Sequence, residues 1–364
     1  MSPHEHTSRI RVAEAAASAI HRAQDERMLE AEAVRKAARF MTRASEVAME
    51  RAAEGGVYTT ALVDRSLGFD NQLMNLALHT LAPGGHTRSR RHGEAIHHVL
   101  DGRGYSLIDG VRYDWKRGDT VHLPSGSVHQ HFNLDPGRPA THVVLSGGPL
   151  YEVLGDYWDI ESAGDHYVDP DDGWEPDHPF VEGQRMPIAA SPTGERWMSS
   201  THVHRHGRKQ EHEDKRKSVR LFTAAEELKI ERSAHKGDFI TSLVDRSLGF
   251  DNRIASLDIH TMPPGSHTET HRHWEAILHI LQGRGYALID GQRYEWQTGD
   301  TIHIQTGVWH QVWNTDPDNP SHILAAKSIG IIEHVMPYRE EALDDDYSRP
   351  DPGFVPPNPW LERS

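Results

Sequence analysis

The segment PGSHTETHRHWEAI at residues 264–277 decides the fold, because it occurs a second time as PGGHTRSRRHGEAI at residues 83–96. The flanking sequence repeats at the same offset of 181 residues. LVDRSLGFDN, for example, occupies residues 62–71 and returns unchanged at residues 243–252. Such self-similarity over a long stretch indicates one structural unit that is present twice in the chain.

The repeated unit has the sequence pattern of a β-structure. Short runs of β-branched and aromatic residues fill residues 57–147, and turn sequences such as APGG, IDG and PSG separate them every 8–12 residues or so. This rhythm is typical of an antiparallel sandwich or barrel. We therefore predict a mainly β fold with two tandem barrels.

The segments around the barrels repeat as well. Residues 10–54 have helix-forming composition, and Pro-rich, acidic segments follow each barrel. We expect these extended arms to wrap a neighbouring barrel or subunit. The expected regions are an N-terminal helical region at 1–56, a barrel at 57–150, an arm, linker and helix at 151–237, a second barrel at 238–330 and an extended arm at 331–364.

Composition excludes several classes of site and partner. The chain has no cysteine, so disulfides, thiolate nucleophiles and cysteine-bound metals are ruled out. Its formal charge of −15 disfavours nucleic acid as a partner. No apolar run is long enough to span a membrane and no export signal is evident, so we expect a cytoplasmic protein. With 28 histidines, imidazole and carboxylate are the expected metal ligands.

One strand of the second unit presents histidines at alternate positions. His271 and His273 are two residues apart, and residues two apart point to the same face of a strand. His310 lies on a later strand of the same unit. Three imidazoles that face into a small barrel can hold a divalent ion on one side and leave its other positions open, although ligand type alone does not choose among Fe, Cu, Zn and Ni.

These histidines carry a resemblance to the cupin superfamily. Gly265, five intervening residues, His271 and His273 resemble the start of the first cupin motif, G-x5-H-x-H-x3,4-E-x6-G. The second motif, G-x5-P-x-G-x2-H-x3-N, is matched by residues 299–314 with Gln305 in place of proline, and by residues 118–133 without a break. The resemblance implies a bicupin, with two double-stranded β-helix barrels of the jelly-roll type.

One departure from the motif points to a subgroup of the cupins. The usual glutamate position holds Ala276, and Glu275 beside it is a possible metal ligand if the preceding loop turns it inward. A bare three-histidine site is similar to that of gentisate 1,2-dioxygenase and its 1-hydroxy-2-naphthoate and salicylate relatives. The resemblance implies Fe(II) at His271, His273 and His310, with Mn, Ni or Zn as the alternatives.

The first unit lacks one of these ligands. Arg90 stands where the second unit has His271, leaving His92 and His129. A guanidinium stays charged and cannot bind a cation. His97 is a candidate substitute ligand, but we expect this degenerate barrel to be structural.

Further candidates surround the triad in sequence. His260, His279 and Gln311 are candidates for substrate contact or acid–base catalysis. Other residues are candidates for the wall of an aromatic pocket: Trp274, Leu278, Trp309 and Trp313.

The leading functional hypothesis is a non-haem Fe(II) dioxygenase that uses O2 to cleave a C–C bond of a small hydroxylated aromatic acid. Its partners are then the aromatic substrate and O2, within a homodimer or homotetramer. A second hypothesis is isomerase, lyase or decarboxylase chemistry with Mn, Ni or Zn, in which Glu275 is a ligand or base. A third is a non-catalytic bicupin that binds a small ligand.

Overall fold

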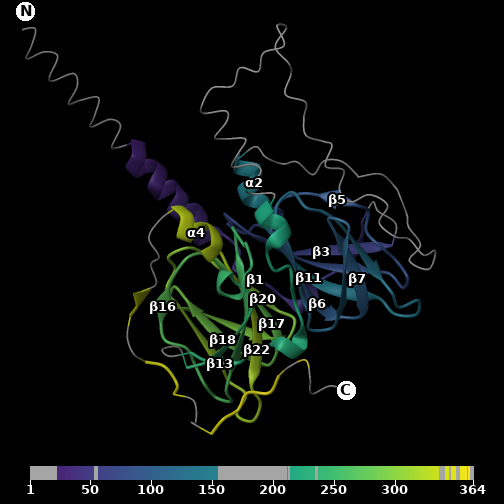
Figure 1. Ribbon diagram of the computed structural model, residues 1–364. Coiled ribbons are helices and arrows are strands. Elements are labelled where there is room, and N and C mark those ends of the chain that lie inside the picture. Colours follow the sequence, from purple (N-terminus) through teal and green to yellow (C-terminus); the bar gives the residue numbers. More distant parts are fainter. Residues whose placement is uncertain are drawn as a thin grey trace, which may run out of the picture.

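The structure is a computed structural model in which two β-barrels lie side by side (Figure 1). It describes residues 23–52, 56–154, 211, 214–233, 237–335, 341–343, 346–349, 353–358 and 360. Each barrel consists of a larger and a smaller antiparallel sheet, which confirms the mainly β fold with two tandem barrels. Among the described residues, no helix is long and apolar enough to cross a membrane.

The N-terminal barrel has a seven-stranded sheet and a four-stranded sheet. The larger sheet has the order β12 (Phe222–Thr223), β9 (Thr120–Leu123), β6 (Ala95–Asp101), β11 (Ala140–Ser146), β4 (Asn75–Leu81), β3 (Val57–Val63) and β2 (Glu50–Arg51). The smaller sheet has the order β5 (Arg90–Arg91), β10 (Val128–Asn133), β7 (Arg103–Ile108) and β8 (Val111–Lys116).

The C-terminal barrel repeats this plan. Its larger sheet has the order β1 (Met41–Thr42), β20 (Thr301–Ile304), β17 (Ala276–Gln282), β22 (Ser321–Lys327), β15 (Ser256–Met262), β14 (Phe239–Val244) and β13 (Glu231–Arg232). Its smaller sheet has the order β19 (Gln292–Gln297), β18 (Arg284–Ile289), β21 (His310–Asn314), β16 (His271–Arg272) and β23 (Glu341–Ala342). Short helices α2 (Gly148–Leu154) and α4 (Ile329–Val335) follow the two barrels.

The two units exchange an edge strand. β1, which precedes the N-terminal barrel, pairs with β20 of the C-terminal barrel, and β12 pairs with β9 in the reciprocal way. The helix expected over residues 10–54 covers residues 23–37 of the described part, and strand and turn follow. Tertiary pairing therefore overrides the helix-forming composition after residue 37.

The identical LVDRSLGFDN segments form turns that dock each barrel on the other. In the first, Asp64 accepts a hydrogen bond from the Ser66 amide, and Gly68 has a φ of 88°, in the left-handed region that favours glycine. Phe69 is buried, and the following amides of Gln72 and Leu73 reach the second barrel. The second copy repeats this geometry at residues 245–249.

The C-terminal arm runs over both barrels. β23 pairs with β16, and the Ser348 amide donates to the His267 carbonyl of the C-terminal barrel. Further along, Trp360 lies beside His98 of the N-terminal barrel, with a ring-centroid distance of 5.0 Å. The described part of the arm thus contacts both repeats of the same chain.

Candidate metal centre

Two adjacent strands of the smaller C-terminal sheet bring three histidines together. His271 on β16 is the direct cross-strand partner of His310 on β21, and His273 follows one residue after β16. The potential ligand atoms of the three rings all lie within 4.8 Å of one another. Among the described residues, no other group of three or more potential metal-ligating side chains comes this close together.

Backbone carbonyls fix the orientation of all three rings. The Nδ1 atoms of His271, His273 and His310 lie 3.0, 2.5 and 3.0 Å from the carbonyl oxygens of Glu269, Trp274 and Val308. A carbonyl only accepts, so each Nδ1 carries the proton and each neutral ring keeps a lone pair on Nε2. This is the arrangement that prepares histidines for a metal ion, and the donor set fits Fe, Zn, Cu or Ni.

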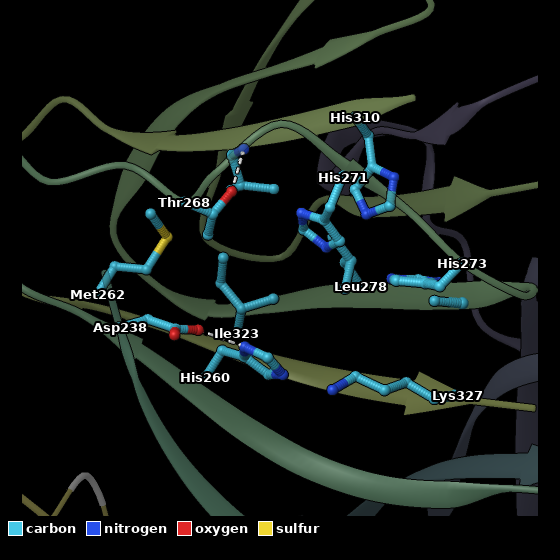
Figure 2. A pocket seen from close by; sticks show the side chains of 12 residues that line it. Asp238, His260, Met262, Thr268, His271, His273, Leu278, His310, Ile323 and Lys327 are labelled. Carbon is cyan, nitrogen blue, oxygen red and sulfur yellow. Dashed lines mark hydrogen bonds and ion pairs between the residues drawn. The ribbon is translucent and has the colours of Figure 1, made fainter. Parts of the chain in front are cut away.

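A small cavity of about 40 Å³ adjoins the triad. Five apolar residues of its lining form what we call the apolar wall: Met262, Ala276, Leu278, Val312 and Ile323. Asp238, His260 and Lys327 line the same cavity, as Figure 2 shows. The cavity therefore combines a water-excluding wall with charged and titratable groups, as small-molecule sites usually do.

His260 and Asp238 form a hydrogen-bonded dyad beside the triad. His260 Nδ1 lies 2.6 Å from the Oδ2 of Asp238, and the Asp238 side chain is fully buried. Since the carboxylate accepts, the proton sits on Nδ1, and the buried Nε2 of His260 has no hydrogen-bond partner. A ring held in this way can accept a proton at Nε2 while the carboxylate stabilises the resulting cation.

Lys327 supplies a positive charge to the same cavity. It enters from β22 with its ammonium directed toward His260 (Figure 2), and its Nζ lies 3.4 Å from Asp258 Oδ2. Both side chains of this ion pair are mostly buried, with 16% and 10% of their surface exposed. An ammonium held at this place is suited to bind a carboxylate of a ligand.

Sequence reasoning did not find Asp238, Asp258 or Lys327, although the repeat contains a signal for them. The corresponding residues of the first unit are Val57, Ala77 and Ser146. The three charged side chains therefore occur only in the repeat with the complete triad. A residue-by-residue comparison of the two copies singles them out.

Glu275, the possible fourth ligand, lies apart from the triad. Its carboxylate accepts hydrogen bonds from the amides of Gln72 (3.1 Å) and Leu73 (2.7 Å) of the other barrel, and Oε1 lies 3.0 Å from His303 Nε2. Glu94 of the first repeat makes the reciprocal contacts with the amides of residues 253–255. Both glutamates thus join the barrels.

The structure also separates several other candidates from the cavity. His279 bonds to Thr301 through Nδ1, and Gln311 donates to the Thr268 carbonyl. Trp313 stacks on His267, and Trp309 lies under the guanidinium of Arg272. Trp274 is buried but does not line the cavity. Leu278 and His260 are the predicted wall and catalytic residues that the structure does bring to the triad.

The N-terminal barrel holds a different set of side chains. Arg90 is the cross-strand partner of His129, and the His92 and His129 rings lie 4.4 Å apart. His97 packs on His131 with a ring-centroid distance of 4.3 Å. These residues line a cavity of about 400 Å³.

Buried neutral histidines make the protein sensitive to acid. Burial lowers the pKa of His98 and of His142 to about 3 and that of His79 and of His279 to about 4. An unfolded histidine has a pKa of about 6.5, so below that pH the unfolded chain gains protons that the folded chain does not accept.

We therefore expect the unfolding free energy to fall as the pH drops from about 6.5 toward 4, by up to about 1.4 kcal/mol per pH unit for each such histidine. Urea unfolding at several pH values measures this slope. The control variant is His142→Ile, because Ile323 occupies the equivalent position of the C-terminal barrel. This substitution should reduce the slope by the amount that corresponds to about one proton. An unchanged slope would contradict this assignment.

Comparison with known proteins agrees with the geometry. The cupin domain family model matches residues 77–146 and 258–327. An uncharacterized protein of Methanocaldococcus jannaschii, MJ1618, is 40% identical over 55 residues, which are 15% of this chain and 44% of that protein; the match therefore spans less than half of the relative.

Solved bicupin structures share the fold. Salicylate 1,2-dioxygenase from Pseudaminobacter salicylatoxidans superposes with a TM-score of 0.53 at 17% identity, covering 78% of this chain and 80% of that one. A mutant of Bacillus subtilis oxalate decarboxylase gives a TM-score of 0.54 at 16% identity, covering 84% and 80%. Residues 77–146 and 258–327 are therefore two cupin domains, and the chain is a bicupin.

Proposed function

We propose that the chain is a metalloenzyme whose C-terminal cupin holds Fe(II) with His271, His273 and His310, and that it is a dioxygenase for a small hydroxylated aromatic acid. The observation that carries this proposal is the bare three-histidine donor set, because Glu275 is used at the barrel interface. The similarity to a salicylate dioxygenase supports the fold of such an enzyme.

The residues around the triad fit a hydroxylated acid. Lys327 attracts its carboxylate, and His260 Nε2 accepts the proton of its hydroxyl group while Asp238 stabilises the imidazolium. Leu278, Val312 and Ile323 exclude water from the reacting atoms. Bound Fe(II) would supply open coordination positions for both the acid and O2 and the redox chemistry of ring cleavage.

One observation favours a second candidate. The cavity of about 40 Å³ is small for an aromatic ring, so the apolar wall has to move to admit one. A non-oxidative reaction of a small acid with Mn, Ni or Zn, such as decarboxylation, needs less space. The structural similarity to oxalate decarboxylase is compatible with this candidate.

Oxygen uptake separates the two candidates. With Fe(II) and a panel of hydroxylated aromatic acids, the first candidate requires O2 consumption that is stoichiometric with substrate loss. Substrate loss without O2, and with Mn, Ni or Zn, would replace it with the second. No turnover under either condition would remove both.

Two variants test the assigned residues once turnover is found. His260→Asn is expected to lower kcat about 10²- to 10⁴-fold, since it removes the proton acceptor. Lys327→Met is expected to raise KM by roughly ten- to a hundredfold, because a charge-assisted contact to the carboxylate is lost. The control is His267→Asn, which changes an imidazole of the same barrel that stacks on Trp313 outside the cavity. Equal kinetics for His260→Asn and the control would contradict the role of His260.

A further inference from the structure

The N-terminal barrel has the features of a ligand site rather than of a decayed copy. Three apolar wall residues of the C-terminal cavity, Leu278, Val312 and Ile323, correspond to His97, His131 and His142 in the first repeat. Burying a polar group costs free energy unless it is hydrogen-bonded. His131 Nδ1 has a partner in Ser106 Oγ, 2.7 Å away, but its buried Nε2 has none, and a bound ligand can remove this cost.

The cavity of this barrel is also the larger one. Its volume of about 400 Å³ compares with about 40 Å³ beside the triad. Sites for small molecules have volumes of roughly 300–1,000 Å³. The lining of the cavity combines apolar residues with Arg90, Glu94 and several histidines; the apolar residues include Val57, Ala77, Ala95 and Val144.

Arg90 gives the cavity a permanent positive charge. It lines the cavity, and its charge is close enough to His129 and His131 to contribute to lowering their pKa values, after burial and the neighbouring histidines. The ring of His129 is therefore neutral at pH 7. A guanidinium beside neutral imidazoles attracts an anion and repels a metal cation.

The ring nitrogens specify further groups of the ligand. Nδ1 of His92 lies 2.7 Å from the Gly93 carbonyl, and Nδ1 of His129 lies 3.1 Å from the Ser127 carbonyl. Both Nδ1 atoms therefore carry the proton, and in the neutral form of such a ring Nε2 is an acceptor. His131 Nε2 is buried without a hydrogen-bond partner at the same cavity. A hydroxyl group can satisfy such nitrogens.

We propose that the N-terminal cupin binds a small hydroxylated carboxylic acid, whose carboxylate pairs with Arg90 and whose hydroxyl group is bound by the histidines of the cavity. This site is separate from the triad and does not depend on the reaction proposed for it. It gives the chain one metal centre and one metal-free acid-binding site.

Calorimetric titration with salicylate as the probe tests this proposal. The full-length chain carries His273→Ala, so that the metal centre does not contribute. We expect a Kd of about 1 mM or tighter, and at least tenfold weaker binding of salicylamide, which lacks the charge. Arg90→Met is expected to weaken salicylate binding about ten- to a hundredfold, and Arg90→Lys less.

The matched control is Arg91→Met, since Arg91 is the exposed neighbour of Arg90 and does not line the cavity. A second variant, His131→Val, introduces the residue of the C-terminal barrel and should also weaken binding if the cavity is the site. The proposal is overturned if salicylate does not bind, if salicylamide binds equally well, or if Arg90→Met and Arg91→Met have the same affinity.

Discussion

Replacing His273 with alanine is expected to reduce the metal content of the anaerobically purified protein from about one ion per chain to almost none. A site with three protein ligands loses most of its affinity when one is removed. The other two rings, His271 and His310, stay in place because their own carbonyl partners hold them. Metal analysis by mass spectrometry gives the stoichiometry directly.

The repeat provides a matched control for this substitution. His92 occupies the position of His273 in the first unit and likewise faces the carbonyl of the next residue through Nδ1. His92→Ala is expected to leave the metal content unchanged, because Arg90 replaces the third ligand there. A loss of metal in His92→Ala equal to that in His273→Ala would show that the assignment of the site to one barrel is wrong.

Replacing Glu275 with alanine is expected to lower the unfolding free energy by about 2–4 kcal/mol without removing the metal. The substitution leaves the amides of Gln72 and Leu73 and the fully buried ring of His303 without their acceptor. Urea unfolding followed by tryptophan fluorescence measures the loss, and metal analysis of the same sample separates it from ligation.

An exposed ion pair serves as the control for Glu275→Ala. Glu333 pairs with Arg246 at 3.0 Å and is 43% exposed, so Glu333→Ala should cost less than about 1 kcal/mol. If Glu275→Ala instead abolished metal binding at unchanged stability, Glu275 would be a ligand and the interface contacts would be unimportant.

The local pattern predicted the two barrels and the assembly of the triad. The barrels could be predicted from turn spacing and the repeat, which are visible in the local sequence. The two-residue spacing of His271 and His273 placed both side chains on the same face of a strand. The exchange of β1 and β12 could not be predicted in this way. A two-residue edge strand has no periodicity, and it forms only because it pairs with a strand of the neighbouring barrel.

Strand alternation explains why several predicted catalytic and wall residues lie outside the cavity. His310 and Val312 face the cavity, so Gln311 and Trp313 of the same strand face the opposite side. His279 likewise alternates with Leu278. Applying the alternation outward from His310 and from Leu278 would have excluded these residues. To predict that Asp238 and Lys327 lie at the cavity, one needs the register between β14, β15 and β22, which the sequence does not provide.

Anomalous diffraction from crystals of the anaerobically purified wild-type protein, recorded at the absorption edge of the bound metal, tests the central claim most directly. The predicted result is one peak per chain, among the Nε2 atoms of His271, His273 and His310, with no peak beside Arg90. A peak beside Arg90, or none at the triad, would contradict a single metal centre in the C-terminal cupin.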